Sequence, residues 1–119
     1  MLPTLDEFLV NSQRNSYVKH HINRVVYTIY LRKGQRYIDG RLYHKVLDIG
    51  NITASRKGTG SFAVLHKHIM SSLWAHDFDG IYVESVLNDQ FANHLLGLGY
   101  TQVNRHFQTV NLFRGVWVG

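Results

Sequence analysis

The sequence predicts a mixed α/β domain, with a twisted sheet of about six mostly antiparallel strands and flanking helices. Segments with the 3.6-residue period of amphipathic helices alternate with β-branched and aromatic runs that favour strands. One helical segment (62–75) lies between two apolar runs (42–52 and 81–86), an order that predicts a crossover joining two parallel central strands. At 119 residues, the chain is long enough for a single domain over 1–119 and too short for two.

The chain begins with a segment that is typical of a capped helix. Thr4-Leu5-Asp6-Glu7 has the capping-box pattern, in which Thr4 and Glu7 each accept from the other's backbone N–H. Leu5, Phe8 and Leu9 then form an apolar stripe. We expect a helix over about 4–14, and we leave open whether it resumes over 17–21.

A meander of three strands is predicted next. Residues 25–31 are mostly β-branched or aromatic, which favours a strand. Lys33-Gly34-Gln35 predicts a turn before a short second strand at 36–38. Asp39-Gly40 is a strong hairpin signal and leads into the third strand, at 42–52.

The C-terminal half predicts two helices and three strands. The helix over 62–75 is followed by an Asp79-Gly80 turn and a buried strand at 81–86. Asn88 is placed to cap the next helix, and Gly99 suits the position just after its end. Two closing strands are expected, at 100–103 and 106–113.

Composition narrows the classes of function. The formal net charge of +5 and the pI of about 9.7 favour anionic partners, but the basic residues are scattered, which disfavours a nucleic-acid-binding arm. The absence of cysteine excludes disulfides and thiolate chemistry. No apolar run approaches the roughly 18 residues of a membrane span, and Asp6 and Glu7 do not fit a secretory signal. We therefore expect a cytoplasmic protein with no membrane partner.

The eight histidines do not predict a metal centre. His20 and His21 are adjacent and His66 and His68 are two apart, so neither pair shares a face of its element. No His-Glu-x-x-His spacing occurs either. We expect surface or half-buried histidines and no metal cofactor.

A glycine-rich segment between a predicted strand and a predicted helix indicates an anion site. It reads Ser55-Arg56-Lys57-Gly58-Thr59-Gly60-Ser61. Backbone N–H groups of such a turn and of the following helix N-terminus can converge on a phosphate, and the glycines allow close approach. No Walker-type Gly-Lys-Ser/Thr is present in it.

This loop, Asn88 and the Gly99-Tyr100 pair together resemble the GNAT (GCN5-related N-acetyltransferase) superfamily of acyl-CoA-dependent transferases, over about residues 25–113. The family's loop reads Gln/Arg-x-x-Gly-x-Gly/Ala, and its later helix commonly starts at Asn and ends in Gly-Phe or Gly-Tyr. The strand 82–87 also looks similar to compact acetyltransferase-like proteins of phages and prophages, which would place the protein in a host cytoplasm.

The resemblance implies a set of cofactor-binding residues. The loop would bind the CoA pyrophosphate, the end of the strand at 51–53 would pair with the pantetheine amides, and Asn88 would bind the pantetheine arm. The strands ending near Ile52 and Val86 must splay so that a thioester can lie between them. The implied residues are Asn51, Ile52, Thr53, Ser55, Arg56, Lys57, Gly58, Thr59, Gly60, Ser61 and Asn88.

The chain departs from the family pattern in two places. Ser55 stands where the family has Gln or Arg, with Arg56 beside it as a substitute. Leu95 stands where a Tyr often protonates the departing thiolate, so either another group such as Tyr100, Tyr82 or Ser85 serves as the acid, or water does, or catalysis is absent.

Two carboxylates are candidates for the general base that an amine acceptor needs. Glu84 comes first because it lies on the strand that flanks the expected splay, and Asp48 comes second on the partner strand. Either carboxylate could instead only pair with a nearby Arg or cap a turn.

The resemblance implies an N-acyltransferase that moves acetyl from acetyl-CoA to a primary amine, namely a protein lysine, an N-terminus or a small amine. The alternative is a catalytically degenerate protein of the same fold that binds CoA or a protein partner. A homodimer is compatible with either function.

Overall fold

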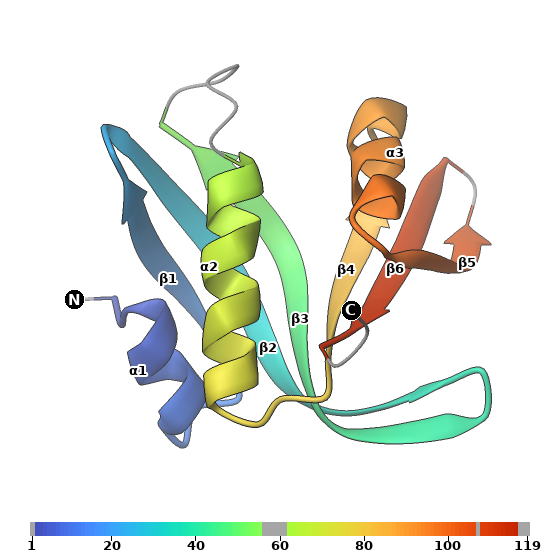
Figure 1. Cartoon of the computed structure of the whole chain (residues 1–119), viewed down its shortest axis with the longest axis horizontal. Helices are drawn as coiled ribbons and strands as arrows, with labels where there is room; N and C mark the ends of the chain where they lie inside the picture. Colours follow the sequence, from blue (N-terminus) through green and yellow to red (C-terminus); the bar gives the residue numbers. More distant parts are fainter. Residues whose placement is uncertain (1, 56–61, 107, 117–119) are drawn as a thin grey trace.

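The computed structural model describes residues 2–55, 62–106 and 108–116. Figure 1 shows a sheet that opens like a V toward the top of the view, with α2 in front of one arm and α3 in front of the other. The elements are α1 (Leu5–Val10), β1 (Asn15–Ile22), β2 (Val25–Ile38), β3 (Arg41–Ala54), α2 (Phe62–Ala75), β4 (Gly80–Val86), α3 (Asp89–Gly97), β5 (Thr101–His106) and β6 (Thr109–Gly115).

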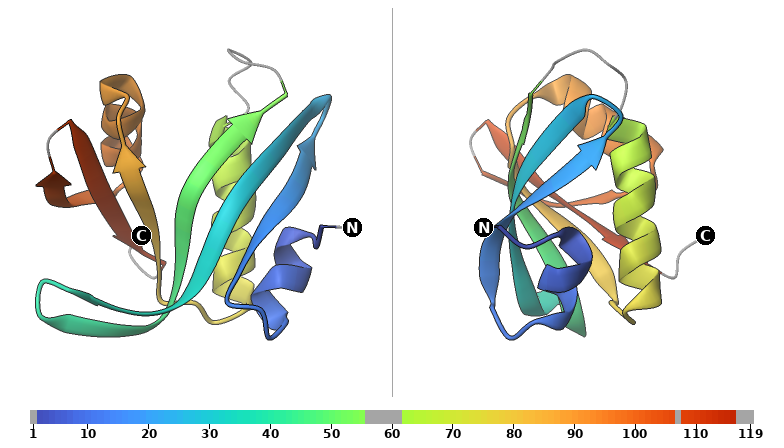
Figure 2. Two further views of the ribbon diagram at one scale, coloured as in Figure 1. Left: turned by 180° about the vertical axis from the view of Figure 1, so that it is seen from behind. Right: turned by 90° about the vertical axis from the view of Figure 1, so that its left-hand side faces the viewer.

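The strands form one sheet in the order β1-β2-β3-β4-β6-β5. The central pair β3–β4 is parallel, with Val46 beside Gly80 and Ile49 beside Val83, and the other neighbouring pairs are antiparallel. Figure 2 shows the strong twist of this sheet. The predicted fold class, a mostly antiparallel sheet with a parallel central pair and flanking helices, is confirmed.

The helices cover one face of the sheet. Buried residues of α1, α2 and α3 join strand residues such as Ile29, Leu47 and Val83 in one apolar cluster. Side chains alternate between the two faces of a strand, so Tyr30, Asp48 and Glu84 belong to the opposite face. We call this second side the open face; the left view of Figure 2 looks onto it, and no helix crosses β1–β3 there.

The prediction of a helix to residue 14, with an open continuation over 17–21, is wrong. The capping box of Thr4 and Glu7 is present, but α1 ends at Val10 and Asn15–Ile22 forms the edge strand β1. The reason is non-local. Val18 and Ile22 alternate with exposed residues, and they are buried under the helices only when β1 pairs with β2.

The predicted turn at Lys33-Gly34-Gln35 is also wrong. Strand β2 runs through it without a break, because Lys33 pairs with Leu47 and Gly34 with Val46, and only a register shift follows. The true reversal is at Asp39-Gly40, as predicted, and both residues have positive φ (51° and 81°), as a type I′ hairpin turn requires.

The far half of this long hairpin folds over the open face of the C-terminal strands. Ile38 and Val46 are buried there with Tyr82 and Phe113, in a cluster separate from the one under the helices. The rings of Tyr43 and Phe113 pack with centroids 4.7 Å apart. The hairpin therefore forms a wall beside the open face of β4.

The ends of α3 are as predicted. The side chain of Asn88 accepts from the backbone N–H of Phe91. At the other end, Gly99 has φ +95° and its N–H donates to Leu96, while the N–H of Tyr100 donates to Leu95, which is a Schellman motif. The closing strands begin slightly later than predicted, at Thr101 and Thr109.

Candidate functional site

A cleft opens where the two parallel strands part. Paired residues of β3 and β4 end at Ile49 and Val83, and beyond them lies a cleft of about 260 Å³. It is lined by 49–52 of β3, by 83–88 and by Phe91 of α3. The expected splay of the central strands is therefore present.

An irregularity in each strand accompanies the parting. On β3, Ile49 and Asn51 pair with consecutive residues of β2, so Gly50 is bulged out of the ladder. On β4, the pairing with β6 shifts after Val83, and Ser85 has a positive φ of 53°. The N–H of Ser85 donates instead to the side chain of Asn111, at 2.7 Å. Bulges of this kind leave backbone groups unpaired by the ladder and re-aim side chains at a site.

Three of the five predicted cofactor residues that the structure describes line this cleft. Asn51, Ile52 and Asn88 line it. Thr53 does not: its hydroxyl donates to the carbonyl of Thr28 on β2, at 3.4 Å. Ser55 is held on β2 by two bonds with Val26, one through its N–H and one accepted by its hydroxyl. The loop predicted to bind pyrophosphate thus starts from a fixed point.

The predicted pyrophosphate loop includes six further residues. Arg56, Lys57, Gly58, Thr59, Gly60 and Ser61 lie outside the described residues. Their assignment to the CoA pyrophosphate stays a prediction.

The two predicted bases lie close together on the open face, each against an arginine that the sequence interpretation had not singled out. The guanidinium of Arg32 contacts both carboxylate oxygens of Glu84. Arg36 contacts Asp48 through two nitrogens, one at 3.2 Å from Oδ1, and lies 3.6 Å from Oε1 of Glu84. We call Arg32, Arg36, Asp48 and Glu84 the charge cluster. Arg32 and Arg36 lie on β2 on the same face as Tyr30, a spacing that the alternation of a strand could have revealed.

The two halves of the charge cluster differ in exposure. The side chain of Asp48 is 12% exposed and that of Glu84 is 22% exposed. Burial by itself would lower the pKa of Arg36, but the hydrogen bond and charge of Asp48 raise it. Its guanidinium also lies 3.8 Å over the ring of Tyr82. Arg36 and Asp48 are therefore a fixed, mostly structural pair, and Glu84, which lines the cleft, is the more accessible carboxylate.

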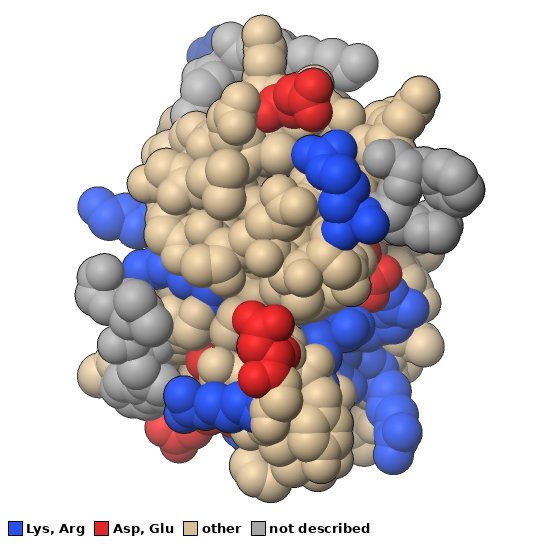
Figure 3. Space-filling view, turned by 90° about the vertical axis from the view of Figure 1, so that its right-hand side faces the viewer, with Lys and Arg blue, Asp and Glu red and all other residues tan. Residues whose placement is uncertain are grey.

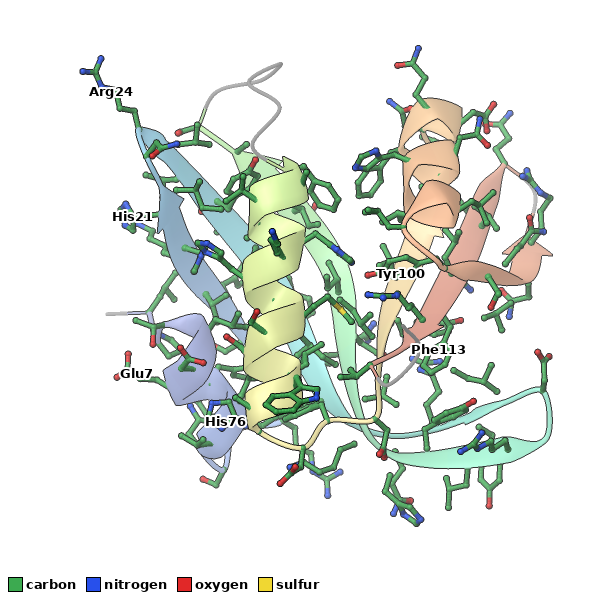
Figure 4. The ribbon with its side chains drawn as sticks, viewed as in Figure 1. Glu7, His21, Arg24, His76, Tyr100 and Phe113 are labelled. Atoms are coloured by element: carbon green, nitrogen blue, oxygen red, sulfur yellow. The ribbon has the colours of Figure 1, made fainter. Side chains whose placement is uncertain are left out.

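The alternatives to the missing tyrosine differ in position. Leu95 is fully buried in the core. Tyr100 is also buried, 2.9 Å from Nε2 of His66, and burial raises its pKa; Figure 4 shows it in the space beside α2. Tyr82 is buried beneath Arg36. Ser85 is exposed and lines the cleft, which neither Tyr82 nor Tyr100 does.

The histidines are arranged differently from the prediction in one respect, since His66 is buried rather than exposed or half-buried. His20 and His68 meet across β1 and α2 with ring nitrogens 3.0 Å apart. Within the described ranges, no three His, Asp or Glu side chains come close enough to hold a metal ion. No described helix has the length and apolar character to cross a membrane.

The surface charges are mixed. Figure 3, which views the side formed by the hairpin and the C-terminal strands, shows Lys and Arg in several groups separated by acidic and uncharged residues. This agrees with the scattered distribution along the sequence.

The fold and the parted strands define a GNAT-like α/β fold, and comparison with known proteins supports this. The solved structures that are similar to the chain include a mutant of the toxin AtaT bound to the C-terminus of the antitoxin AtaR and acetyl-CoA (TM-score 0.55), and the same mutant bound to the AtaR C-terminus (TM-score 0.59). Each is 19% identical in sequence to the chain, and the match covers 76% of the chain's own length. The chain spans only 58% of the length of either structure, and at this identity the likeness shows the fold alone. No protein-family model and no curated protein sequence matches the chain.

Proposed function

We propose that the protein is an acyl-CoA-dependent N-acyltransferase that moves acetyl from acetyl-CoA to a primary amine. The observation that supports this most directly is the cleft between the parted parallel strands, with the bulge at Gly50 on one wall and Glu84 on the other. In open α/β sheets ligands bind outside the carboxyl ends of parallel strands, and this cleft lies beyond that end of the β3–β4 pairing. The acetyl-CoA in one AtaT structure is consistent with the same substrate here.

The transfer would proceed by direct attack. The amine nitrogen attacks the thioester carbonyl carbon, a C–N bond forms and the C–S bond breaks, and CoA leaves as thiolate. Glu84, directly or through water, takes the proton that the amine loses. In this proposal backbone N–H groups of β3 between Gly50 and Ile52 stabilise the oxyanion, and the Ser85 hydroxyl relays a proton from water to the thiolate.

The remaining implied residues would hold the CoA moiety. Asn51 and Ile52 would bond the pantetheine amides along β3, and the amide nitrogen of Asn88 could donate to the same arm, since its oxygen caps α3. The loop at 55–61 would bind the pyrophosphate. The resemblance to phage-encoded proteins and the cytoplasmic location remain part of this proposal.

A non-catalytic protein of the same fold is the second candidate. Two observations favour it: Leu95 carries no hydroxyl at the usual acid position, and Glu84 is already paired with Arg32. Such a protein would bind acyl-CoA or a protein partner without turnover. The AtaT structures contain a segment of a protein partner, which is consistent with this alternative.

Titration calorimetry of the full chain with acetyl-CoA and with desulfo-CoA tests binding. We expect micromolar affinity for both. Gly58→Val should abolish it, because a side chain at this position would clash with the pyrophosphate, while the circular-dichroism spectrum should not change. Folded protein free of copurified CoA that binds neither compound would contradict the proposed function.

Transfer of labelled acetyl to amines separates the two candidates. Glu84→Gln should lower kcat by about 10²–10⁴-fold, the usual contribution of a general base, without weakening desulfo-CoA binding. Glu7→Gln is the matched control, because Gln also serves in a capping box and Glu7 lies on α1. Binding without turnover by the unmodified protein would favour the non-catalytic alternative, and turnover unaffected by Glu84→Gln would remove Glu84 as the base.

A further inference from the structure

The charge cluster contains two ion pairs, Arg36–Asp48 and Arg32–Glu84, which differ in how firmly the arginine is held. Arg36 bonds the buried Asp48 with two nitrogens and stacks on Tyr82, so it is held from several sides. Arg32 instead meets Glu84 through a single nitrogen, Nη2, and its side chain is 42% exposed. Of the two pairs, Arg32–Glu84 is therefore the one that a ligand can enter.

One donor of Arg32 is left without a partner in its contact with Glu84. Its Nε is enclosed, and within the part of the chain that the structure describes it has no hydrogen-bond partner. A guanidinium presents five N–H donors in a fixed plane that fits a carboxylate with two parallel bonds. The contact with Glu84 is made through Nη2 alone, so Arg32 has to shift within this pair before a carboxylate can take two parallel bonds from it.

An acceptor amine that enters the cleft meets Glu84 while this carboxylate is paired with Arg32. Glu84 lines the cleft, so an ammonium group that approaches the thioester reaches the carboxylate that Arg32 occupies. Displacing Arg32 would leave its charge without a counter-ion. An acceptor that carries its own anion avoids this loss, because the single protein ion pair is exchanged for two pairs between protein and ligand.

We propose that the acceptor is a small amine with a carboxylate a few atoms from its amino group, as in an α-amino acid. Glu84 receives the ammonium group and Arg32 receives the carboxylate. The exposed side chain of Asn51, on the adjoining wall of the cleft, offers an amide for further hydrogen bonding. The inference rests on the proposed function and narrows its acceptor from amines in general to this class.

Matched pairs of amines test the proposal. Each amine is given to the full chain with saturating acetyl-CoA, and the rate of transfer is measured as the release of CoA thiol. The pairs are glycine against glycinamide and phenylalanine against phenylalaninamide, with an Nα-blocked lysine amide as a side-chain amine. We expect kcat/KM for each acid to exceed that for its amide by about tenfold or more, as loss of a charge-assisted hydrogen bond implies. Equal or higher values for the amides or for the blocked lysine would overturn the proposal.

The Arg32→Gln variant tests whether Arg32 itself causes the preference for acids. It should bring the acid-to-amide ratio close to one, mainly through KM for the acids. Arg24→Gln is the control, since this exposed arginine lies at the far turn between β1 and β2 and its removal changes the net charge equally. A ratio that survives Arg32→Gln, or that falls equally with Arg24→Gln, contradicts a role for Arg32 in binding the carboxylate.

Binding measurements distinguish failure of this inference from failure of the proposed function. The same amines are titrated into ¹⁵N-labelled protein, with and without desulfo-CoA, and affinity is taken from chemical-shift changes. Preference for the acids that depends on Arg32 supports the inference even if no amine is acetylated, whereas absent or non-selective binding overturns it. Absence of CoA binding and of turnover contradicts the proposed function alone.

Discussion

Two lysines on the sheet bind the C-terminal ends of helices that have no basic residue in their last turn. Nζ of Lys33 donates to the carbonyls of Phe8 and Asn11 at the end of α1, the latter at 2.6 Å. Nζ of Lys45 donates to the carbonyl of His76, directly after α2, at 2.7 Å. Cations stabilise the exposed carbonyls at this end of a helix. Each lysine thus ties a helix to the sheet.

Lys33→Met should therefore lower the free energy of unfolding by about 1–3 kcal/mol, the cost of unsatisfied acceptors at a helix end. The change is measured by urea denaturation at neutral pH. Lys19→Met, at an exposed position of β1, is the matched control and should shift stability by no more than about 0.5 kcal/mol. Equal effects of the two substitutions would argue against a specific role for Lys33.

At the scale of elements, the β2–β3 hairpin matters most because it has two functions. The half away from the Asp39-Gly40 turn supplies the wall of the cleft at 49–52. Its far half buries Ile38 against Phe113 and brings Arg36 into the charge cluster. The turn at Asp39-Gly40 sets the register of the far half, and two register shifts, between Gly34 and Arg36 and between Tyr30 and Leu31, separate it from the pairing beside the cleft.

Gly40→Ala should weaken the hairpin by about 1–2 kcal/mol, because φ at this position is +81°, which an L side chain adopts only with strain. Gly97→Ala is the control: Gly97 has open space around it in α3, so this change should be neutral or stabilising by up to about 1 kcal/mol. Urea denaturation gives both values. Desulfo-CoA affinity should change with neither variant, since the turn lies at the opposite end of β3 from the cleft; a loss confined to Gly40→Ala would show that the two ends are coupled.

At the scale of the whole molecule, contacts on both faces of the sheet join the two arms of the V, and on the open face these are the charge cluster and the apolar cluster of the hairpin. The arms also share the parallel β3–β4 pairing and, on the helix side, the edge-to-face contact of Phe62 with Phe91 and the bond between His66 and Tyr100. Burial, together with the nearby charges of Arg114 and His94, lowers the pKa of His66 to about 4. His66 is thus neutral where it connects α2 to the start of β5.

This pKa makes stability depend on pH. Because the pKa of His66 is about 4 when folded and 6.5 ordinarily, the unfolded chain takes up the proton first as the pH falls. The contribution of neutral His66 to the free energy of unfolding is complete above about pH 6.5. It is lost progressively as the pH falls toward 4, by about 2–3 kcal/mol.

Urea denaturation at several pH values between 7.5 and 4 measures this loss. His66→Gln should flatten the profile, while His21→Gln, at an exposed position of β1, should leave the slope unchanged. An identical slope in the His66→Gln variant would mean that another group causes the acid sensitivity.

Features carried by neighbouring residues could be predicted from the sequence. The capping box at Thr4, the turn at Asp39-Gly40 and the end of α3 at Gly99 each depend on groups a few residues apart, and all are present. The parallel central pair followed from the order of elements, and the parting of the strands followed from the family resemblance. Glu84 was correctly placed beside the cleft on the same grounds.

Features that depend on distant partners could not be predicted in this way. Residues 15–22 form a strand because β2 offers them a register that buries Val18, and residues 33–35 continue a strand because β3 pairs with them. In the site, Arg32 and Glu84 are 52 positions apart, and no local pattern indicates that they meet.

The sequence by itself therefore determined the caps, the hairpin turn, the order of helices and strands and the family resemblance, because hydrogen-bonding and conformational preferences of this kind act over a few residues. Only the tertiary structure decided which segment forms the edge strand, that the hairpin covers the C-terminal strands, and that both candidate bases lie in ion pairs. The physical reason is that burial and charge pairing depend on groups from strands far apart in the chain, which come together only when the sheet has formed.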